Sequence, residues 1–303
     1  MLDRLAGNTA LKQDLAAALA ADRLAHSILL VGEQGCGAGF AARCLAADYL
    51  YPGGGPHAEA VLRGQDTECI SIRGEGASGQ IKVERIRDAR EEITHSALAE
   101  DARGRVLFVY GAQNMNQSSA NALLKIIEEP PEGVLFLFTA ASAAAVLPTI
   151  RSRCAAYTIA PVPGEECAAV LRQHLPALTR DAADDLAFLY EGHIGLGLAA
   201  VQQPDIREAL DRARTFAGYA RQQDSYRALA LTARMEKDRA AAGAFFQQLA
   251  FVGSAALRRP GYGGLEADRA AVLLRAAGKA REALRANGNL RLLLAVFTAE
   301  SCR

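Results

Sequence analysis

Residues 27–39 read SILLVGEQGCGAG, a continuous apolar run followed by a glycine-rich turn. An apolar run without polar alternation is typical of a strand buried on both faces of a parallel sheet. A helix pattern follows directly, from Phe40 to about Tyr49. A glycine-rich turn between such a strand and a helix suits a phosphate, because backbone N–H groups converge there and no Cβ blocks approach. The stretch predicts an α/β fold built around a nucleotide-binding type of turn.

Four more apolar runs predict the rest of the sheet, at residues 68–72, 106–110, 134–138 and 155–159. Helix patterns lie between them, at about 8–23, 83–97 and 118–128, and residues 52–64, rich in glycine and proline, are predicted as a loop. This alternation predicts a five-stranded parallel sheet with helices on both faces. After Ile159 the strand signals stop and helix patterns continue to the end. We predict domains at residues 1–159, 160–205 and 206–303, the last two all-helical.

The composition is that of a globular chain of 303 residues, 50% hydrophobic and 22% charged. The net charge is zero, since Lys plus Arg and Asp plus Glu both total 34. Net charge therefore provides no general attraction to nucleic acid or membrane, although binding through a local basic patch stays possible. The six cysteines form no CxxC pair, which favours reduced thiols. The start at Met1 shows no apolar targeting segment. We expect a cytoplasmic protein without a membrane partner.

The glycine-rich turn lacks the side chains that handle ATP. In a P-loop, a lysine reaches the β- and γ-phosphates and a following Ser or Thr ligates magnesium. Here these two positions are Ala38 and Gly39, while Gly32, Gly35 and Gly37 remain. The sequence therefore predicts a degenerate nucleotide loop.

The strand at 106–110 lacks the acid that hydrolysis also requires. A carboxylate at the end of a neighbouring strand holds the magnesium ion in such enzymes, but this strand ends in Tyr110-Gly111-Ala112-Gln113. We predict no ATP hydrolysis by the chain itself. Residual nucleotide binding and a turn that merely connects strand to helix both stay open.

A dinucleotide site is the weaker alternative. Residues 37–42 fit G-x-G-x-x-A, yet Gly37 comes six residues after Val31 instead of directly after the strand. No acid clearly ends a second strand about 20 residues further on to bind the ribose.

Two stretches carry a more specific signal. Residues 119–131 read SANALLKIIEEPP and residues 147–154 read LPTIRSRC, and RLAHSILLVG at 23–32 precedes them. These stretches resemble the AAA+ clamp-loader subunits of bacterial DNA polymerase III, and within that family the delta-prime branch most closely. The resemblance is clear over residues 1–159 and fainter over 160–205. It implies an AAA+ P-loop domain, a small helical lid and an all-α C-terminal collar.

The resemblance also implies partners and site residues. The chain would join gamma/tau motor subunits and delta in a hetero-pentameric ring that loads a sliding clamp on primer-template DNA within the polymerase holoenzyme. Arg153 of Ser-Arg-Cys would reach the γ-phosphate of a neighbour's ATP in trans, a task suited to a planar, always charged guanidinium. Its alternative is an ordinary salt-bridged arginine at a helix end. Arg151, Ser152 and Lys125 are candidate contacts to an interface or DNA; Arg151 could instead pair with a local acid, and Lys125 with Glu129 at i, i+4.

Several departures from the family concern cofactors. The family usually has four zinc-binding cysteines between the P-loop and the second strand, whereas this chain offers His57 and Cys69 there and Cys44 just before. We therefore predict no zinc or other cofactor, and a shortened or disordered loop in this interval. No sensor arginine stands at residues 192–197, and Thr139, at the place of a γ-phosphate sensor, is expected to be vestigial.

These patterns favour a non-hydrolysing, delta-prime-like subunit that supplies an arginine finger in trans. The resemblance agrees with the altered nucleotide loop, because delta-prime subunits often lack functional nucleotide sites. Two alternatives stay open: a gamma/tau-like ATPase motor, which would need lysine at position 38 and acids at 110 and 111, and a P-loop-derived interaction protein outside replication.

Overall fold

The computed structural model describes residues 1–76, 79–95, 97 and 99–302. The chain forms two compact units, described here each by itself. The first contains Met1–Val170 with Gly192–Gly195, and the second contains Leu171–Glu191 and the chain from Leu196 onward. The division into three domains at residues 159 and 205 stays a prediction.

The first unit is built on one five-stranded sheet in the order β2-β3-β4-β1-β5, with all neighbouring strands parallel. The strands are β1 (Ser27–Val31), β2 (Cys69–Arg73), β3 (Arg105–Tyr110), β4 (Val134–Ala140) and β5 (Ala155–Thr158). The predicted parallel sheet is confirmed, with strand ends that differ from the prediction by one or two residues.

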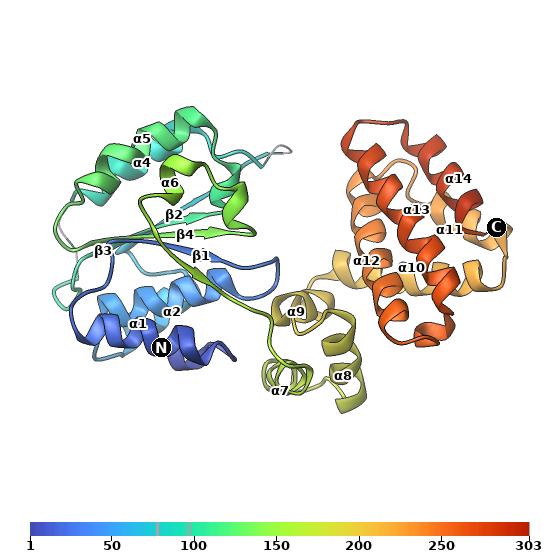
Figure 1. Cartoon of the computed structure of the whole chain (residues 1–303), viewed down its shortest axis with the longest axis horizontal. Helices are drawn as coiled ribbons and strands as arrows, with labels where there is room; N and C mark the ends of the chain where they lie inside the picture. Colours follow the sequence, from blue (N-terminus) through green and yellow to red (C-terminus); the bar gives the residue numbers. More distant parts are fainter. Residues whose placement is uncertain (77–78, 96, 98, 303) are drawn as a thin grey trace. The chain divides into compact units, whose positions relative to one another are not determined.

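Helices cover both faces of the sheet, as Figure 1 shows. On one face lie α1 (Thr9–Ala20) and α2 (Ala38–Leu50); on the other lie α4 (Val83–Ile93), α5 (Gln117–Glu128) and the short α6 (Pro148–Arg151). Successive strand residues point to opposite faces. Ile28 and Leu30 of β1 accordingly pack in the core with α1 and α2, and Leu29 packs in the core with α4 and α5. Burial on both faces explains why β1 reads as an unbroken apolar run.

The predicted loop at residues 52–64 is wrong, because a helix, α3 (Pro56–Arg63), occupies most of it. Proline stands in its first turn and Gly64, with φ 70°, ends it. Proline at a helix start and glycine just past its end are boundary signals as well as loop signals. Ala58 and Val61 are fully buried and fix the helix to the core. The interval before β2 is therefore not the disordered loop that the sequence predicts, and its shortening relative to the family stays a prediction.

Two helix ends also differ from the prediction. Helix α4 ends at Ile93 instead of Ala97, and Ser96 within the predicted range lies outside the described residues. Asn8 precedes α1 but its side chain does not cap it. Its Nδ2 donates to the carbonyl oxygen of Ala160 at 3.1 Å and its Oδ1 accepts from the Ala160 N–H at 2.9 Å. Asn8 thus ties the start of α1 to the chain after β5.

The second unit is helical. It contains α8 (Arg180–Leu189), α10 (Pro204–Arg221), α11 (Ser225–Ala233), α12 (Arg239–Arg258), α13 (Ala267–Arg285) and α14 (Leu290–Ser301), while α7 (Gly164–His174) and α9 (Ile194–Gln202) belong partly to each unit. Short 3₁₀ turns are η1 (Leu2–Arg4), η2 (Ala112–Asn114), η3 (Ala143–Ala145) and η4 (Tyr262–Gly264).

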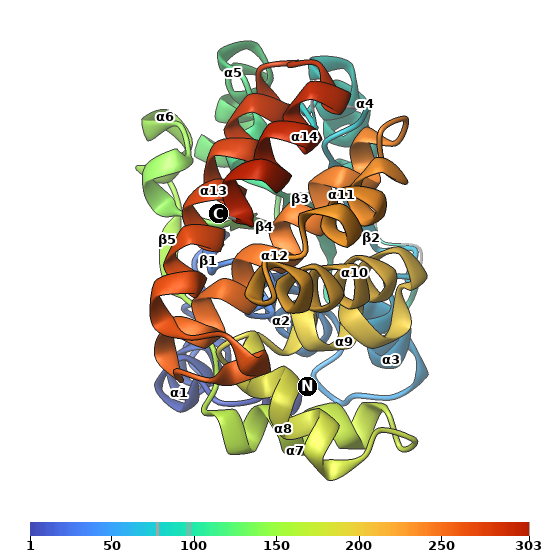
Figure 2. The same ribbon diagram turned by 90° about the vertical axis from the view of Figure 1, so that its right-hand side faces the viewer.

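Helix α12 is the core helix of the second unit. It packs against α10 and α13, and α13 lies beside α14 (Figure 2). Phe245 and Phe246 of α12 are fully buried and contact the ring of Phe297. Among the described helices, α12 alone is long and apolar enough to cross a membrane by length and composition, with half of the apolar window buried inside the protein. Its apolar character is accounted for by this core.

We expect Leu29→Ala to lower the free energy of unfolding of the first unit by about 2–5 kcal/mol, because loss of the fully buried side chain would leave a cavity in the core between the sheet and helices α4 and α5. Urea unfolding followed by circular dichroism measures the effect. The matched control, Leu292→Ala, removes a side chain that is 64% exposed and should cost less than about 0.5 kcal/mol. Equal, small effects of both variants would contradict the assignment of β1 as a strand buried on both faces of the sheet.

Candidate functional site

The glycine-rich turn keeps the backbone shape of a phosphate loop. It connects β1 to α2, and Gly35 and Gly37 have φ values of 93° and 96°. This left-handed region favours glycine, because a Cβ strains it. Helix α2 begins at Ala38, directly after Gly37. The structure therefore places the predicted loop residues together at the start of a helix, with no lysine or hydroxyl among them.

A tyrosine ring lies beside this turn. A Cβ added at Gly39 would lie 3.4 Å from Cε1 of Tyr110, which ends β3. The guanidinium of Arg73 lies over the same ring, 4.1 Å from its centroid. Tyr110 stands where a hydrolysing P-loop enzyme has its magnesium-binding carboxylate. The Arg73–Tyr110 pair was not foreseen, because no local sequence pattern links residues on adjacent strands.

The residue after Tyr110 is held in a conformation that suits glycine. Gly111 has φ 76°, and a Cβ there would lie 3.0 Å from Nδ2 of Asn114. The Gly111 N–H donates to Oγ1 of Thr139 at 3.1 Å. Thr139 is buried at the end of β4, so its hydroxyl holds the backbone of Gly111. A glutamate at position 111 would be strained, and a vestigial role for Thr139 as a phosphate sensor stays a prediction.

Residues 192–195 close against the glycine-rich turn from another side. The Gly195 N–H donates to the carbonyl oxygen of Gly35 at 2.9 Å, and His193 Nε2 lies 3.2 Å from a carboxylate oxygen of Glu33. The approach is tight, since a Cβ at Gly195 would lie 3.0 Å from Cα of Gly35. His193 thus contacts a residue of the turn. The carbonyl oxygen of Gly35 and the carboxylate of Glu33 thus have partners within the protein.

Arg153 lies at the surface, just after α6. Its Nε donates to Oε1 of Glu128 at 2.6 Å and its Nη2 lies 2.5 Å from the same oxygen. Its Nη1 donates to the carbonyl oxygen of Thr149 at 3.0 Å. The Arg153 side chain is 36% exposed and that of Glu128 is 47% exposed. The geometry matches a salt-bridged arginine near a helix end, and it leaves the guanidinium accessible; a role in trans stays a prediction.

The other candidate contacts surround this pair. Arg151 donates to the carbonyl oxygen of Ala143 at 3.2 Å, and the Ser152 hydroxyl donates to that of Thr149 at 3.4 Å. Lys125 lies on α5, one turn before Glu128, and helps to line a groove of about 410 Å³ beside α4. Among the ion pairs of the described residues none contains Lys125, so its pairing with Glu129 is not formed here.

The interval where the family carries zinc is organised by other contacts. The Tyr51 hydroxyl lies 3.2 Å from both carboxylate oxygens of Asp66, and the Tyr51 ring stacks on His57. Burial raises the pKa of the Cys44 thiol to about 12 and also raises the pKa of Cys69. In the described ranges, no cluster of three or more His, Cys, Asp or Glu side chains could hold a metal ion. The absence of zinc and of other cofactors stays a prediction.

Comparison with known proteins assigns the family. Residues 7–163, just over half of the chain, match the family described as "DNA polymerase III, delta subunit". The chain belongs to this family. The DNA polymerase III gamma/tau subunit of Mycobacterium tuberculosis is 34% identical over 168 residues, which are 52% of this chain and 28% of that protein. The delta' subunit of Haemophilus influenzae is 40% identical over 88 residues, 29% of this chain and 26% of that protein.

Both relatives are matched over only about a quarter of their own length. A solved structure covers more: a DNA polymerase III gamma subunit-related protein of Thermotoga maritima has a TM-score of 0.56 and 19% identity, covering 95% of this chain and 99% of that one. At this identity the likeness concerns the fold alone. The predicted architecture, a five-stranded parallel sheet followed by a helical region, is confirmed.

We expect no ATP hydrolysis above background by the variant A38K/G39T. The substitutions supply a P-loop lysine and hydroxyl, but Tyr110 and Gly111 supply no carboxylate for magnesium, and the Tyr110 ring lies in contact distance of a side chain at position 39. Phosphate release with Mg²⁺-ATP measures the outcome, and thermal unfolding verifies that the variant is folded. Sustained ATP turnover by the folded variant would contradict the conclusion that the missing carboxylate at the end of β3 prevents hydrolysis.

Proposed function

We propose that the chain is a subunit of the DNA polymerase III clamp loader that does not hydrolyse ATP itself and supplies Arg153 to ATP held by a neighbouring motor subunit. Support for the loader comes from the family match and from relatives named delta' and gamma/tau. One observation carries the division of labour. The chain's own glycine-rich turn lacks every side chain that ATP hydrolysis uses, while the Arg153 guanidinium is accessible at the surface.

The chemistry of Arg153 suits a γ-phosphate. A guanidinium is charged at all physiological pH values, and its planar fork of N–H groups matches phosphate oxygens. Negative charge on the transferred phosphoryl group is stabilised by such a cation placed before the reaction begins. The Thr149 carbonyl oxygen, on α6, holds one side of the guanidinium. Arg153 would therefore act on the neighbour's nucleotide, with Arg151 and Ser152 in the same interface.

The gamma/tau-like motor is the less favoured alternative. It would require a lysine at position 38, where Ala38 opens α2, and acids where Tyr110 and Gly111 stand. The Arg73–Tyr110 pair and the contact of Gly195 with Gly35 lie beside the turn that would have to bind the motor's own ATP. A P-loop-derived interaction protein outside replication would share these losses but would not need Arg153.

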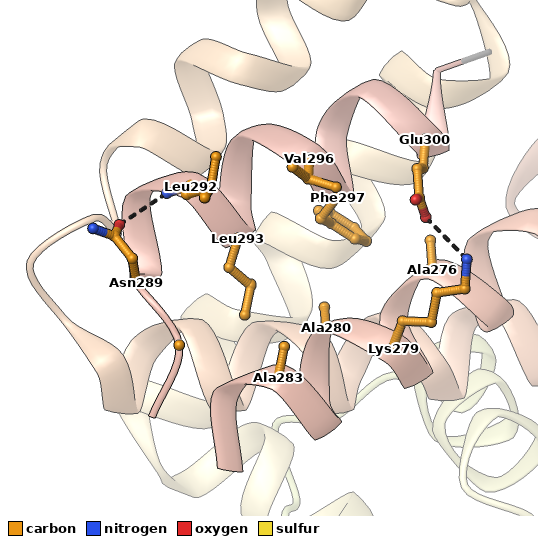
Figure 3. Close-up of a pocket in the computed structure, with 11 residues that line it drawn as sticks. Ala276, Lys279, Ala280, Ala283, Asn289, Leu292, Leu293, Val296, Phe297 and Glu300 are labelled. Atoms are coloured by element: carbon orange, nitrogen blue, oxygen red, sulfur yellow. Dashed lines mark hydrogen bonds and ion pairs between the residues drawn. The ribbon is translucent and has the colours of Figure 1, made fainter. Parts of the chain in front are cut away.

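A second surface supports membership of a ring. Tyr226 of α11 is 82% exposed, and Leu292 and Val296 on the adjacent α14 are 64% and 48% exposed. Large exposed apolar side chains on adjacent helices are typical of protein interfaces. Leu292 and Val296 also line a shallow groove of about 290 Å³ beside α13 (Figure 3). We propose that this face packs against collar helices of gamma/tau or delta subunits in a hetero-pentameric ring.

The remaining parts of the role follow from this assembly. The sliding clamp and primer-template DNA would be engaged through the complex, with Lys125 as a candidate phosphate contact. Replication in a bacterium takes place in the cytoplasm, which is where the complex would act.

We expect Arg153→Ala to remove the increase in ATP turnover that the chain gives to a loader reconstituted from the host's motor subunits, delta, clamp and primed DNA. Loss of an arginine finger lowers the rate in GTPases by roughly 10³- to 10⁵-fold. ATP hydrolysis at the neighbouring motor subunit's site should therefore become undetectable. Arg172→Ala, at an exposed arginine of α7, is the matched control and should leave turnover as in the wild type. A wild-type chain that joins the ring without changing turnover would exclude the role of Arg153, and one that never joins would exclude the loader itself.

We expect Leu292→Asp to weaken binding to the motor subunits by roughly tenfold or more, because a charge in a buried apolar contact costs at least about 1.4 kcal/mol. Analytical ultracentrifugation of the mixture measures the dissociation constant. Leu257→Asp places the same charge at a residue of α12 that is 40% exposed and outside the α11–α14 face, so it should bind as the wild type. Indistinguishable affinities for all three chains would place the interface elsewhere.

A further inference from the structure

The ion pair at Arg153 joins the two most specific stretches of the sequence. Glu128 is the last residue of α5, within SANALLKIIEEPP, and Arg153 lies in LPTIRSRC. We infer that Glu128 is a positioning residue that fixes the direction of the Arg153 guanidinium toward the neighbour's γ-phosphate. This inference rests on the proposed function of Arg153 in trans.

The contacts define which edge of the guanidinium is held. Glu128 Oε1 binds the side edge, at 2.6 Å from Nε and 2.5 Å from Nη2. Nη1 contacts the carbonyl oxygen of Thr149 at 3.0 Å and the Ser152 hydroxyl oxygen at 3.3 Å. A guanidinium has five N–H donors. Within the described part of the chain, these four contacts leave one donor of Nη2 for an outside acceptor.

Glu128 is itself held in place by the fold. Ile126 and Ile127, directly before it, are buried in the core between α5 and the sheet. At the other end of α5, the Asn116 side chain accepts from the Ser119 N–H at 2.8 Å and caps the helix. A long arginine side chain has many rotamers, and an anchored carboxylate selects among them. Glu128 can thus transmit the rigidity of α5 to the tip of Arg153.

Glu129, the next residue, provides a natural comparison. It is exposed like Glu128, but among the ion pairs between described residues none contains it. The two carboxylates carry the same charge at nearly the same place, and only Glu128 contacts Arg153. A general electrostatic effect would be shared by both, whereas positioning belongs to Glu128 alone.

The reconstituted loader tests this with Glu128→Gln, Glu128→Ala and the control Glu129→Gln. We expect the turnover added by the chain to fall by roughly three- to tenfold in Glu128→Ala, because small misplacements of a catalytic group are costly. Glu128→Gln retains an acceptor oxygen and should lose less, and Glu129→Gln should match the wild type. The KM for ATP should not change, since the neighbour's own loop binds the nucleotide. In an Arg153→Ala background, Glu128→Ala should cause no further loss.

The outcomes distinguish failure of the positioning role of Glu128 from failure of the proposed role of Arg153 in trans. If Arg153→Ala leaves turnover unchanged, the role in trans fails and the positioning role fails with it. If Arg153→Ala removes the stimulation while both Glu128 variants match the wild type, only the positioning role is wrong. Higher turnover of the Glu128 variants would show that Glu128 restrains Arg153, and an additional loss in the double variant would show that it acts by another route; both overturn the inference. Thermal unfolding and ring co-elution confirm that each variant is folded and assembled.

Discussion

Burial of β1 on both faces of the sheet is the constraint on which the first unit depends. Its apolar side chains point alternately into two cores, one with α1 and α2 and one with α4 and α5. In a parallel sheet the carboxyl ends of all strands meet at one edge. The glycine-rich turn after β1, Tyr110 after β3 and Thr139 near the end of β4 therefore gather there. What this edge can do depends on the few side chains that the strands deliver to it.

At this edge, contacts between groups of the protein itself surround the glycine-rich turn and the ends of β3 and β4. Thr139 binds the backbone of Gly111, Arg73 covers Tyr110, and Gly195 binds Gly35. In the proposed role, the catalytic group of this chain is Arg153. Its guanidinium would act on ATP bound by a neighbouring subunit instead of at the chain's own glycine-rich turn. A subunit of this kind contributes a fixed cation and needs no turnover of its own.

Much of the fold could be predicted from the sequence, because buried parallel strands have a strong apolar signature and β1, β3 and β4 each carry it. Helix α3 was missed because the proline and glycines that bound it also occur in loops, and only the burial of Val61 reveals the helix. The candidate residues of the turn and Arg153 were found by motif. The contact of Arg73 with Tyr110 and that of Glu128 with Arg153 were not predicted, because they join different strands or helices and depend on tertiary packing that no local pattern encodes.

A structure of the assembled loader with a non-hydrolysable ATP analogue, primed DNA and clamp tests the central claim most directly. The account predicts that a nitrogen of the Arg153 guanidinium lies within about 3 Å of a γ-phosphate oxygen bound by the adjacent motor subunit. It also predicts that Gly195 still binds Gly35 and that this chain's own turn holds no nucleotide. Arg153 turned away from every nucleotide, or an ATP analogue bound between Gly32 and Gly39, would contradict it.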